Sequence, residues 1–100
     1  MEKTEYSAPH ASEPFRLFLI EDNLGDIELI QEAFSRSKNR IILTTAHDGV
    51  EALEVLNSLF AKGPQNLPDL VLLDLNLPKM DGRETLSRLK EDRRFRMLPV

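Results

Sequence analysis

The apolar residues of this chain fall into short uninterrupted runs, separated by longer stretches in which apolar positions recur periodically. Three runs are free of charged residues, at residues 17–20, 41–46 and 70–73. Runs this short, with no polar face and with turn-forming residues at their ends, are typical of strands buried inside a sheet. The sequence therefore predicts three strands, the third of which extends from Asp69 to Asp74.

Between these runs, apolar residues recur every three or four positions, which indicates amphipathic helices. One helix is expected over residues 24–38, a second over residues 49–62 and a shorter third beyond Gly82. Residues 97–100 are expected to approach a fourth strand. Because strands alternate with helices through short connections, the predicted architecture is an α/β fold whose parallel sheet carries helices on both faces.

The length of 100 residues suffices for one domain with a modest core. Residues 1–14 contain two prolines and few apolar groups, so they are expected to form a flexible N-terminal leader. The folded domain is accordingly predicted to occupy residues 15–100.

Charge and composition exclude several classes of function. The net charge is -4 and the basic cluster at Arg93, Arg94 and Arg96 is only local, so no direct binding of nucleic acid is expected. The absence of cysteine excludes disulfides, thiol catalysis and zinc–thiolate sites. No apolar run is long enough for a signal core or a membrane span, so a cytoplasmic protein without membrane contact is expected.

Acidic residues end two of the predicted strands. Glu21 and Asp22 follow the first strand, and Asp74 ends the third. Since parallel strands end at the same edge of a sheet, where α/β folds bind their ligands, the three carboxylates should converge. Two ionised carboxylates about 4 Å apart repel each other by about 4 kcal/mol at an effective dielectric constant of about 20, so the cluster calls for a cation. Oxygen-only ligands favour Mg²⁺.

A bound Mg²⁺ would let an anionic phosphoryl group approach Asp74, which could accept it as an acyl phosphate. Two other interpretations stay open. Polar residues after strands also cap helices or form turns, a role open to Asp22, Asn23 and Asp26. A Mg²⁺-dependent phosphatase with an aspartate nucleophile also places an aspartate after a buried strand. Such enzymes usually carry a second aspartate two positions on, where this chain has Asn76.

As a set, three segments resemble the receiver domain of two-component response regulators. They are the strand ending in Glu21-Asp22, residues 46–53, and the block from Asp74 to Leu77-Pro78-Lys79-Met80-Asp81-Gly82. The resemblance, which covers residues 15–100, implies a flavodoxin-like doubly wound sheet with strand order 2-1-3-4-5. It also implies that Asp74 accepts a phosphoryl group from the phosphohistidine of a sensor histidine kinase, which makes the chain a switch rather than a conventional enzyme.

The same resemblance implies a set of ligands for Mg²⁺. Asp22 would bind the ion directly, Glu21 mainly through water, and Asn76 through its backbone carbonyl. More narrowly, residues 21–33 and 74–84 are similar to the stand-alone receivers that partner bacterial phytochromes. This subgroup implies a single-domain regulator, often a homodimer, without an attached DNA-binding domain.

The chain departs from the family's pattern at its C-terminal end. In a whole receiver, a hydroxyl residue after strand four and a lysine after strand five help to hold the phosphoryl group, and Val100 precedes both. We therefore expect a receiver truncated at the start of strand four, with an apolar strip of sheet left bare that favours self-association. A further interpretation is a phosphorylation-incompetent interaction module that keeps only the fold.

Overall fold

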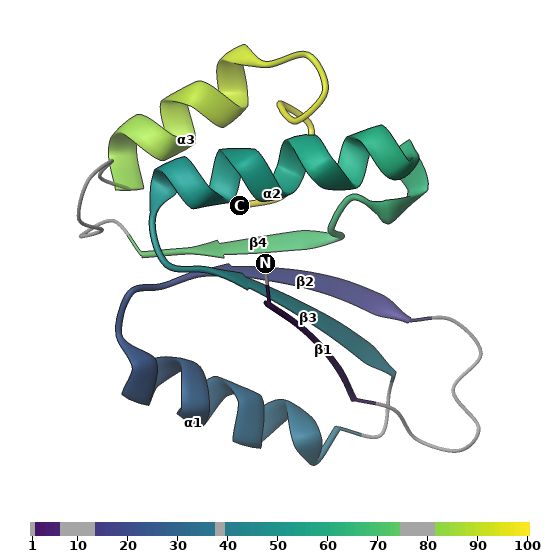
Figure 1. Ribbon diagram of the computed structural model, residues 1–100, viewed down its shortest axis with the longest axis vertical. Coiled ribbons are helices and arrows are strands. Elements are labelled where there is room, and N and C mark those ends of the chain that lie inside the picture. Colours follow the sequence, from purple (N-terminus) through teal and green to yellow (C-terminus); the bar gives the residue numbers. More distant parts are fainter. Residues whose placement is uncertain (1, 7–13, 38–39, 75–81) are drawn as a thin grey trace.

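The computed structural model describes residues 2–6, 14–37, 40–74 and 82–100. This part of the chain forms one four-stranded sheet with helices on both faces (Figure 1). In chain order the elements are β1 (Glu2–Tyr6), β2 (Phe15–Ile20), α1 (Leu24–Ser35), β3 (Ile41–Ala46), α2 (Gly49–Lys62), a short 3-10 helix η1 (Pro64–Asn66), β4 (Leu70–Leu73) and α3 (Gly82–Glu91).

The three strands predicted from the apolar runs are confirmed, and they run parallel. β2 lies in the centre, pairs with β3 along its whole length and pairs with β4 over its last four residues. This register places the final residues of the three strands, Ile20, Ala46 and Leu73, side by side at one edge. The order β3-β2-β4 corresponds to the 2-1-3 part of the expected doubly wound sheet.

The N-terminal residues differ from the expectation of a flexible leader. Residues 2–6 form β1, which pairs antiparallel with β3, from Glu2 opposite Thr45 to Tyr6 opposite Ile41. The leader prediction is therefore wrong for this segment, while residues 7–13 lie outside the described part. The reason is physical: the outer edge of β3 carries unpaired backbone groups, and a strand can satisfy them without an apolar run of its own.

The helices cover the sheet on both sides, as expected. α1 lies on one face, and α2 and α3 lie on the other (Figure 1). α1 ends at Ser35, earlier than the predicted end at residue 38, because the backbone N–H groups of Arg36 and Ser37 donate to the carbonyls of Ala33 and Phe34 and close the last turn. Among the described residues, no helix is both long and apolar enough to span a membrane.

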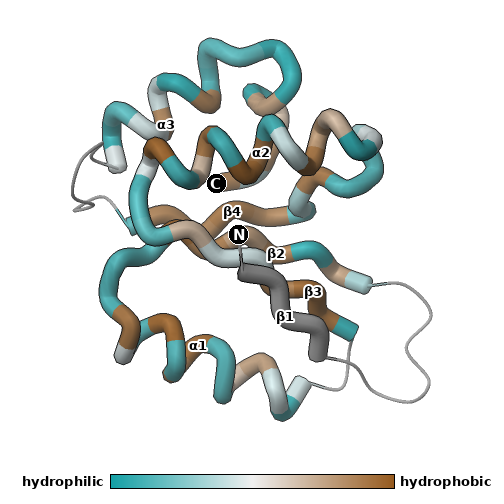
Figure 2. Tube along the Cα trace, viewed as in Figure 1, coloured by the Kyte–Doolittle hydropathy of each residue, from teal (hydrophilic) through white to brown (hydrophobic). Residues whose placement is uncertain are grey.

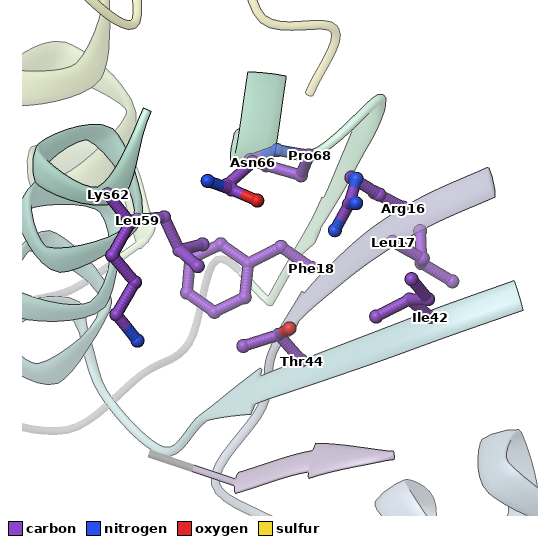
Figure 3. Close-up of a pocket in the computed structure, with 9 residues that line it drawn as sticks. All are labelled: Arg16, Leu17, Phe18, Ile42, Thr44, Leu59, Lys62, Asn66 and Pro68. Atoms are coloured by element: carbon purple, nitrogen blue, oxygen red, sulfur yellow. The ribbon is translucent and has the colours of Figure 1, made fainter. Parts of the chain in front are cut away.

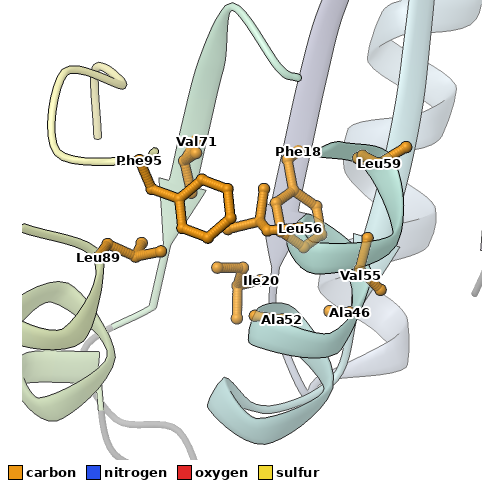
Figure 4. Packing of buried hydrophobic residues seen from close by; sticks show 10 residues of the cluster. All are labelled: Phe18, Ile20, Ala46, Ala52, Val55, Leu56, Leu59, Val71, Leu89 and Phe95. Carbon is orange, nitrogen blue, oxygen red and sulfur yellow. The ribbon is translucent and has the colours of Figure 1, made fainter. Parts of the chain in front are cut away.

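Alternate residues of the strands build two cores, one on each face of the sheet. The apolar positions accordingly concentrate in the strands and on the helix sides that face them (Figure 2). Beneath α2 and α3, Phe18, Ile20 and Val71 contact side chains from both helices (Figure 4). The main members of the smaller core beside α1 are Leu17, Leu19, Ile27, Ile41 and Leu43. The strands that end in acidic residues therefore have buried apolar side chains on both faces of the sheet.

The last residues lie beside β4, although no strand is assigned there. The backbone N–H of Val71 donates to the carbonyl of Pro99 across 2.9 Å. Phe95, 1 % exposed, anchors the segment after α3 in the larger core. The chain thus reaches the side of β4 opposite β2, the position expected for the approach to a fourth strand.

Asp48→Ala is expected to lower the free energy of unfolding by about 1 kcal/mol. The Asp48 carboxylate caps α2 by accepting the backbone N–H of Glu51 across 2.8 Å, and alanine leaves that donor without its partner. Urea unfolding followed by circular dichroism measures the loss. Asp48→Asn, which keeps a capping oxygen, serves as the control, and an equal loss in both variants would contradict the capping role.

Candidate metal and phosphoacceptor site

Two hydrogen bonds between neighbouring strands fix the backbone of the predicted site. The N–H of Glu21 donates to the carbonyl of Ala46 across 2.9 Å, and the N–H of Asp74 donates to the carbonyl of Ile20 across 3.1 Å. Each acidic residue therefore continues the hydrogen-bond ladder by one step beyond its own strand. This arrangement holds Glu21 and Asp74 at the same edge of the sheet on a rigid base.

The three predicted carboxylates converge at this edge. One carboxylate oxygen each from Glu21, Asp22 and Asp74 lies within 4.8 Å of the other two. Oxygens bound to one octahedral Mg²⁺ lie about 3.0 Å apart when adjacent and about 4.2 Å apart when opposite, so side-chain adjustment or a bridging water would let all three carboxylates serve one ion. Glu21 and Asp74 are half-buried and Asp22 is exposed, which leaves one side open to solvent. The donor set therefore fits a hard divalent cation.

The pKa of Glu21 also indicates that this site favours a cation. Burial raises the pKa of the Glu21 carboxyl, and the nearby carboxylates of Asp74, Asp26 and Asp22 raise it further. The N–H of Asn23, which donates to Glu21 Oε1 across 3.1 Å, opposes this rise in pKa. The ionised form of Glu21 is thus disfavoured by burial and by repulsion from the neighbouring carboxylates, and a bound cation would offset this repulsion.

Asp26 lies beside the site, whereas the residue pattern predicted only a helix cap or a turn for it. It lies in the first turn of α1, where its backbone N–H donates to Asn23 Oδ1 across 3.0 Å. Its carboxylate acts on the pKa of Glu21 and lines the hollow beside the acidic cluster. The available signal was its position in the first turn of the helix that follows Asp22.

A hollow of about 420 Å³ opens next to the carboxylates on the side of α1. Its polar lining is acidic, from Glu21, Asp26 and Asp74, and its remaining lining is apolar. Further along the same face lies a second hollow of about 490 Å³, which we call the apolar groove. The residues that line the apolar groove are Phe15, Leu17, Phe34, Arg40, Ile41, Leu70 and Leu72.

Other residues named from the sequence have different outcomes. Asn76 and the rest of residues 75–81 lie outside the described part, so the carbonyl ligand and the loop after Asp74 stay predictions. Gly49 opens α2 and is buried, in agreement with the predicted start of this helix.

The comparisons with known proteins decide the family. Residues 17–100 match the sequence model of the response regulator receiver domain. The chain belongs to this family. Among curated proteins, the receiver is 43% identical over 90 residues to the probable methanogenesis regulatory protein FilR2 of Methanothrix harundinacea, covering 90% of this chain and 57% of FilR2. It is 37% identical over 87 residues to the response regulator Rcp1 of Synechocystis, covering 87% of this chain and 59% of Rcp1.

Solved structures show the same relationship for the receiver. The phosphorylated cyanobacterial phytochrome response regulator RcpA matches with a TM-score of 0.74 and 43% identity, over 88% of this chain and 63% of that one. The Mn²⁺-bound form of Rcp1 matches with a TM-score of 0.77, over 87% of this chain and 63% of that one. These matches confirm the flavodoxin-like fold. The receiver spans 57–63% of the length of these relatives.

Glu21→Gln is expected to stabilise the metal-free receiver slightly at neutral pH. The pKa of the Glu21 carboxyl is higher in the folded chain than in the unfolded chain, so the protonated carboxyl stabilises the fold at a pH below the ordinary glutamate pKa. This stabilisation is lost as the pH rises through the pKa of the folded chain. Glutamine removes the charge and keeps an oxygen for the N–H of Asn23. Since Glu21 is only partly buried, the gain is below about 1 kcal/mol.

Urea unfolding in metal-free buffer at acidic and neutral pH measures this effect. The difference in unfolding free energy between Glu21→Gln and the original chain should grow from the acidic to the neutral condition. A difference that does not change with pH would contradict the assignment.

Proposed function

We propose that this receiver accepts a phosphoryl group on Asp74 from the phosphohistidine of a sensor histidine kinase, with Mg²⁺ held by Glu21, Asp22 and Asp74. The observation that carries the proposal is the convergence of three carboxylate oxygens within 4.8 Å at the carboxyl edge of the parallel sheet. The Mn²⁺-bound form of Rcp1 and the phosphorylated RcpA support it as relatives, since both match most of this chain.

In the proposed reaction, a carboxylate oxygen of Asp74 attacks phosphorus in line with the phosphoimidazole nitrogen. The O–P bond of an acyl phosphate forms, the P–N bond breaks, and the imidazole leaves with the electron pair. When bound, Mg²⁺ supplies the positive charge that offsets the phosphoryl oxygens. The chain's own contribution is position: the bond from Asp74 N–H to the Ile20 carbonyl fixes the backbone that carries the nucleophile.

Each acidic residue has a proposed part at this site. Asp22 binds the ion directly from the exposed side, while half-buried Glu21 acts mainly through a water molecule. Asn76 adds its backbone carbonyl oxygen to the proposed Mg²⁺ ligands. Receiver domains in general are not conventional enzymes, and here the chain catalyses transfer only to its own Asp74.

The proposed partner is a sensor histidine kinase, with a bacterial phytochrome as the specific candidate. The support is similarity to the phytochrome response regulator RcpA and to the bacteriophytochrome response regulator AtBRR, which is 36% identical over 89% of this chain. We propose a cytoplasmic protein that contacts neither membrane nor nucleic acid directly.

We also propose that two copies self-associate through the apolar groove. Within the described part, α1 covers only a portion of this face, and beside it Phe15 and Leu72 are 44% and 36% exposed. Exposed apolar side chains gathered in one concave surface favour association with another apolar surface.

Intact-mass spectrometry after incubation with acetyl phosphate and Mg²⁺ tests the proposed function. The chain should gain the mass of one phosphoryl group, and Asp74→Asn should abolish the gain. Asp92→Asn is the matched control, because Asp92 lies after α3 in an ion pair with Arg94, away from the strand ends. No gain in the original chain would favour a phosphorylation-incompetent interaction module, and a gain that persists in Asp74→Asn would place the acceptor elsewhere.

A further inference from the structure

A small cavity lies at the opposite end of the sheet from the acidic cluster (Figure 3). It occupies the α2 face near the amino ends of β2 and β4, where α2 ends and η1 begins, and its volume is about 70 Å³. Four lining side chains carry hydrogen-bond donors: Arg16, Thr44, Lys62 and Asn66. The cavity contains no carboxylate among its lining residues.

The donor groups of this cavity are available. Within the described residues, the side chains of Arg16, Lys62 and Asn66 form no hydrogen bond or ion pair with the protein. Asp69, the nearest acid along the chain, accepts the backbone N–H of Arg16 across 2.8 Å and does not pair with its guanidinium. Two positive charges thus flank one cavity without an acidic partner there.

The placement of these groups is suited to an anion. In Figure 3 the guanidinium of Arg16 and the ammonium of Lys62 lie on opposite sides of the Phe18 ring, with the Asn66 amide above it and Thr44 below. Thr44 is only 6% exposed, so its hydroxyl belongs to the cavity wall rather than to the open surface. Guanidinium and ammonium groups bind oxyanions through charge-assisted hydrogen bonds, and the guanidinium can do so with two parallel bonds.

The size of the cavity limits the ligand. Its volume corresponds to roughly five water-sized positions, comparable with one phosphate or sulfate ion. We propose that this cavity, which we call the basic pocket, binds a single tetrahedral oxyanion, either free or as the terminal phosphate of a small molecule. The bound anion would be held by Arg16 on β2 and Asn66 on η1, and Lys62 would add positive charge from the other side of the Phe18 ring. The proposal is independent of Asp74, which lies at the other edge of the sheet.

Phosphate titration followed by ¹⁵N–¹H NMR of the whole chain tests the proposal. The buffer is metal-free, so that the acidic cluster repels phosphate, and chloride holds the ionic strength constant. Saturable shifts are expected for the amides of Arg16, Thr44 and Asn66. Sulfate should cause similar shifts. A second titration with glycerol phosphate shows whether the pocket binds a phosphomonoester more tightly than the free phosphate ion.

Matched variants make the test specific. Arg16→Gln should weaken phosphate binding about tenfold, the loss of one charge-assisted hydrogen bond, and Lys62→Gln, whose ammonium lies beyond the Phe18 ring, about twofold to threefold. Arg93→Gln removes an equal charge from an exposed position outside the basic pocket and should change binding little. Asp74→Asn should bind phosphate as the original chain does. Absent or unsaturable shifts, or an equal loss in Arg93→Gln, would overturn the proposal.

Discussion

Asp22→Asn is expected to weaken Mg²⁺ binding by at least about tenfold, because it removes a charged ligand from the acidic cluster. An amide oxygen carries no net charge, so only the carboxylates of Glu21 and Asp74 would then offset the charge of the ion. Asp22 is exposed, so the variant is expected to fold. Isothermal titration calorimetry with Mg²⁺, and NMR line broadening with Mn²⁺, measure the loss.

Asp26→Asn is the matched control for this prediction. Asp26 contributes to the electrostatics of Glu21, but it is not among the three residues whose oxygens converge. Its substitution should therefore weaken binding only about twofold to threefold, as expected for a screened charge at longer range. Equal losses in the two variants would mean that general negative charge, rather than coordination by Asp22, attracts the ion.

Mg²⁺ binding also has a consequence for stability. A cation that binds only the folded receiver raises the free energy of unfolding by about 2.7 kcal/mol at a concentration of 100 times its dissociation constant. At the same Mg²⁺ concentration, Asp22→Asn should lose about 1.4 kcal/mol of this gain, since tenfold weaker binding corresponds to that energy. Thermal unfolding with and without Mg²⁺ gives an independent measurement.

The acidic cluster could be predicted from the sequence because each step had a strong local signal. The apolar runs before Glu21 and Asp74 identify buried strands, and the alternation of helix, strand and helix between them predicts that the strands are parallel. Parallel strands bring their last residues to one edge, so convergence follows without further information. The exact distances depend on backbone bonds such as that from Asp74 N–H to Ile20, which no residue pattern reveals.

Two features could not be predicted in this way. β1 pairs with β3 through backbone groups, so its identity as a strand leaves little trace in a segment as polar as residues 2–6. The basic pocket combines Arg16, Lys62 and Asn66, which are separated along the chain and come together only when α2 packs on the sheet. Both features depend on contacts between segments that are distant in the sequence, and local residue propensities do not reveal such contacts.

A substitution in the apolar groove is expected to weaken self-association strongly. A leucine side chain that becomes fully buried contributes about 1.5–3 kcal/mol. Leu72 lines the apolar groove and is 36% exposed, so a polar residue there should weaken self-association by about tenfold or more. Leu72→Gln is therefore expected to shift the receiver towards monomer.

Sedimentation velocity over a range of protein concentrations measures this shift. The original chain should show a concentration-dependent average mass, and Leu72→Gln should sediment as a monomer at concentrations where the original chain is associated. Met97→Gln is the control, because Met97 is 85% exposed but does not line the apolar groove, so its loss should leave self-association unchanged. Circular dichroism verifies that both variants keep their helices. A stable, well-folded monomer of the original chain at every concentration would contradict the role of the groove, since its exposed apolar side chains would then be tolerated in water without a partner.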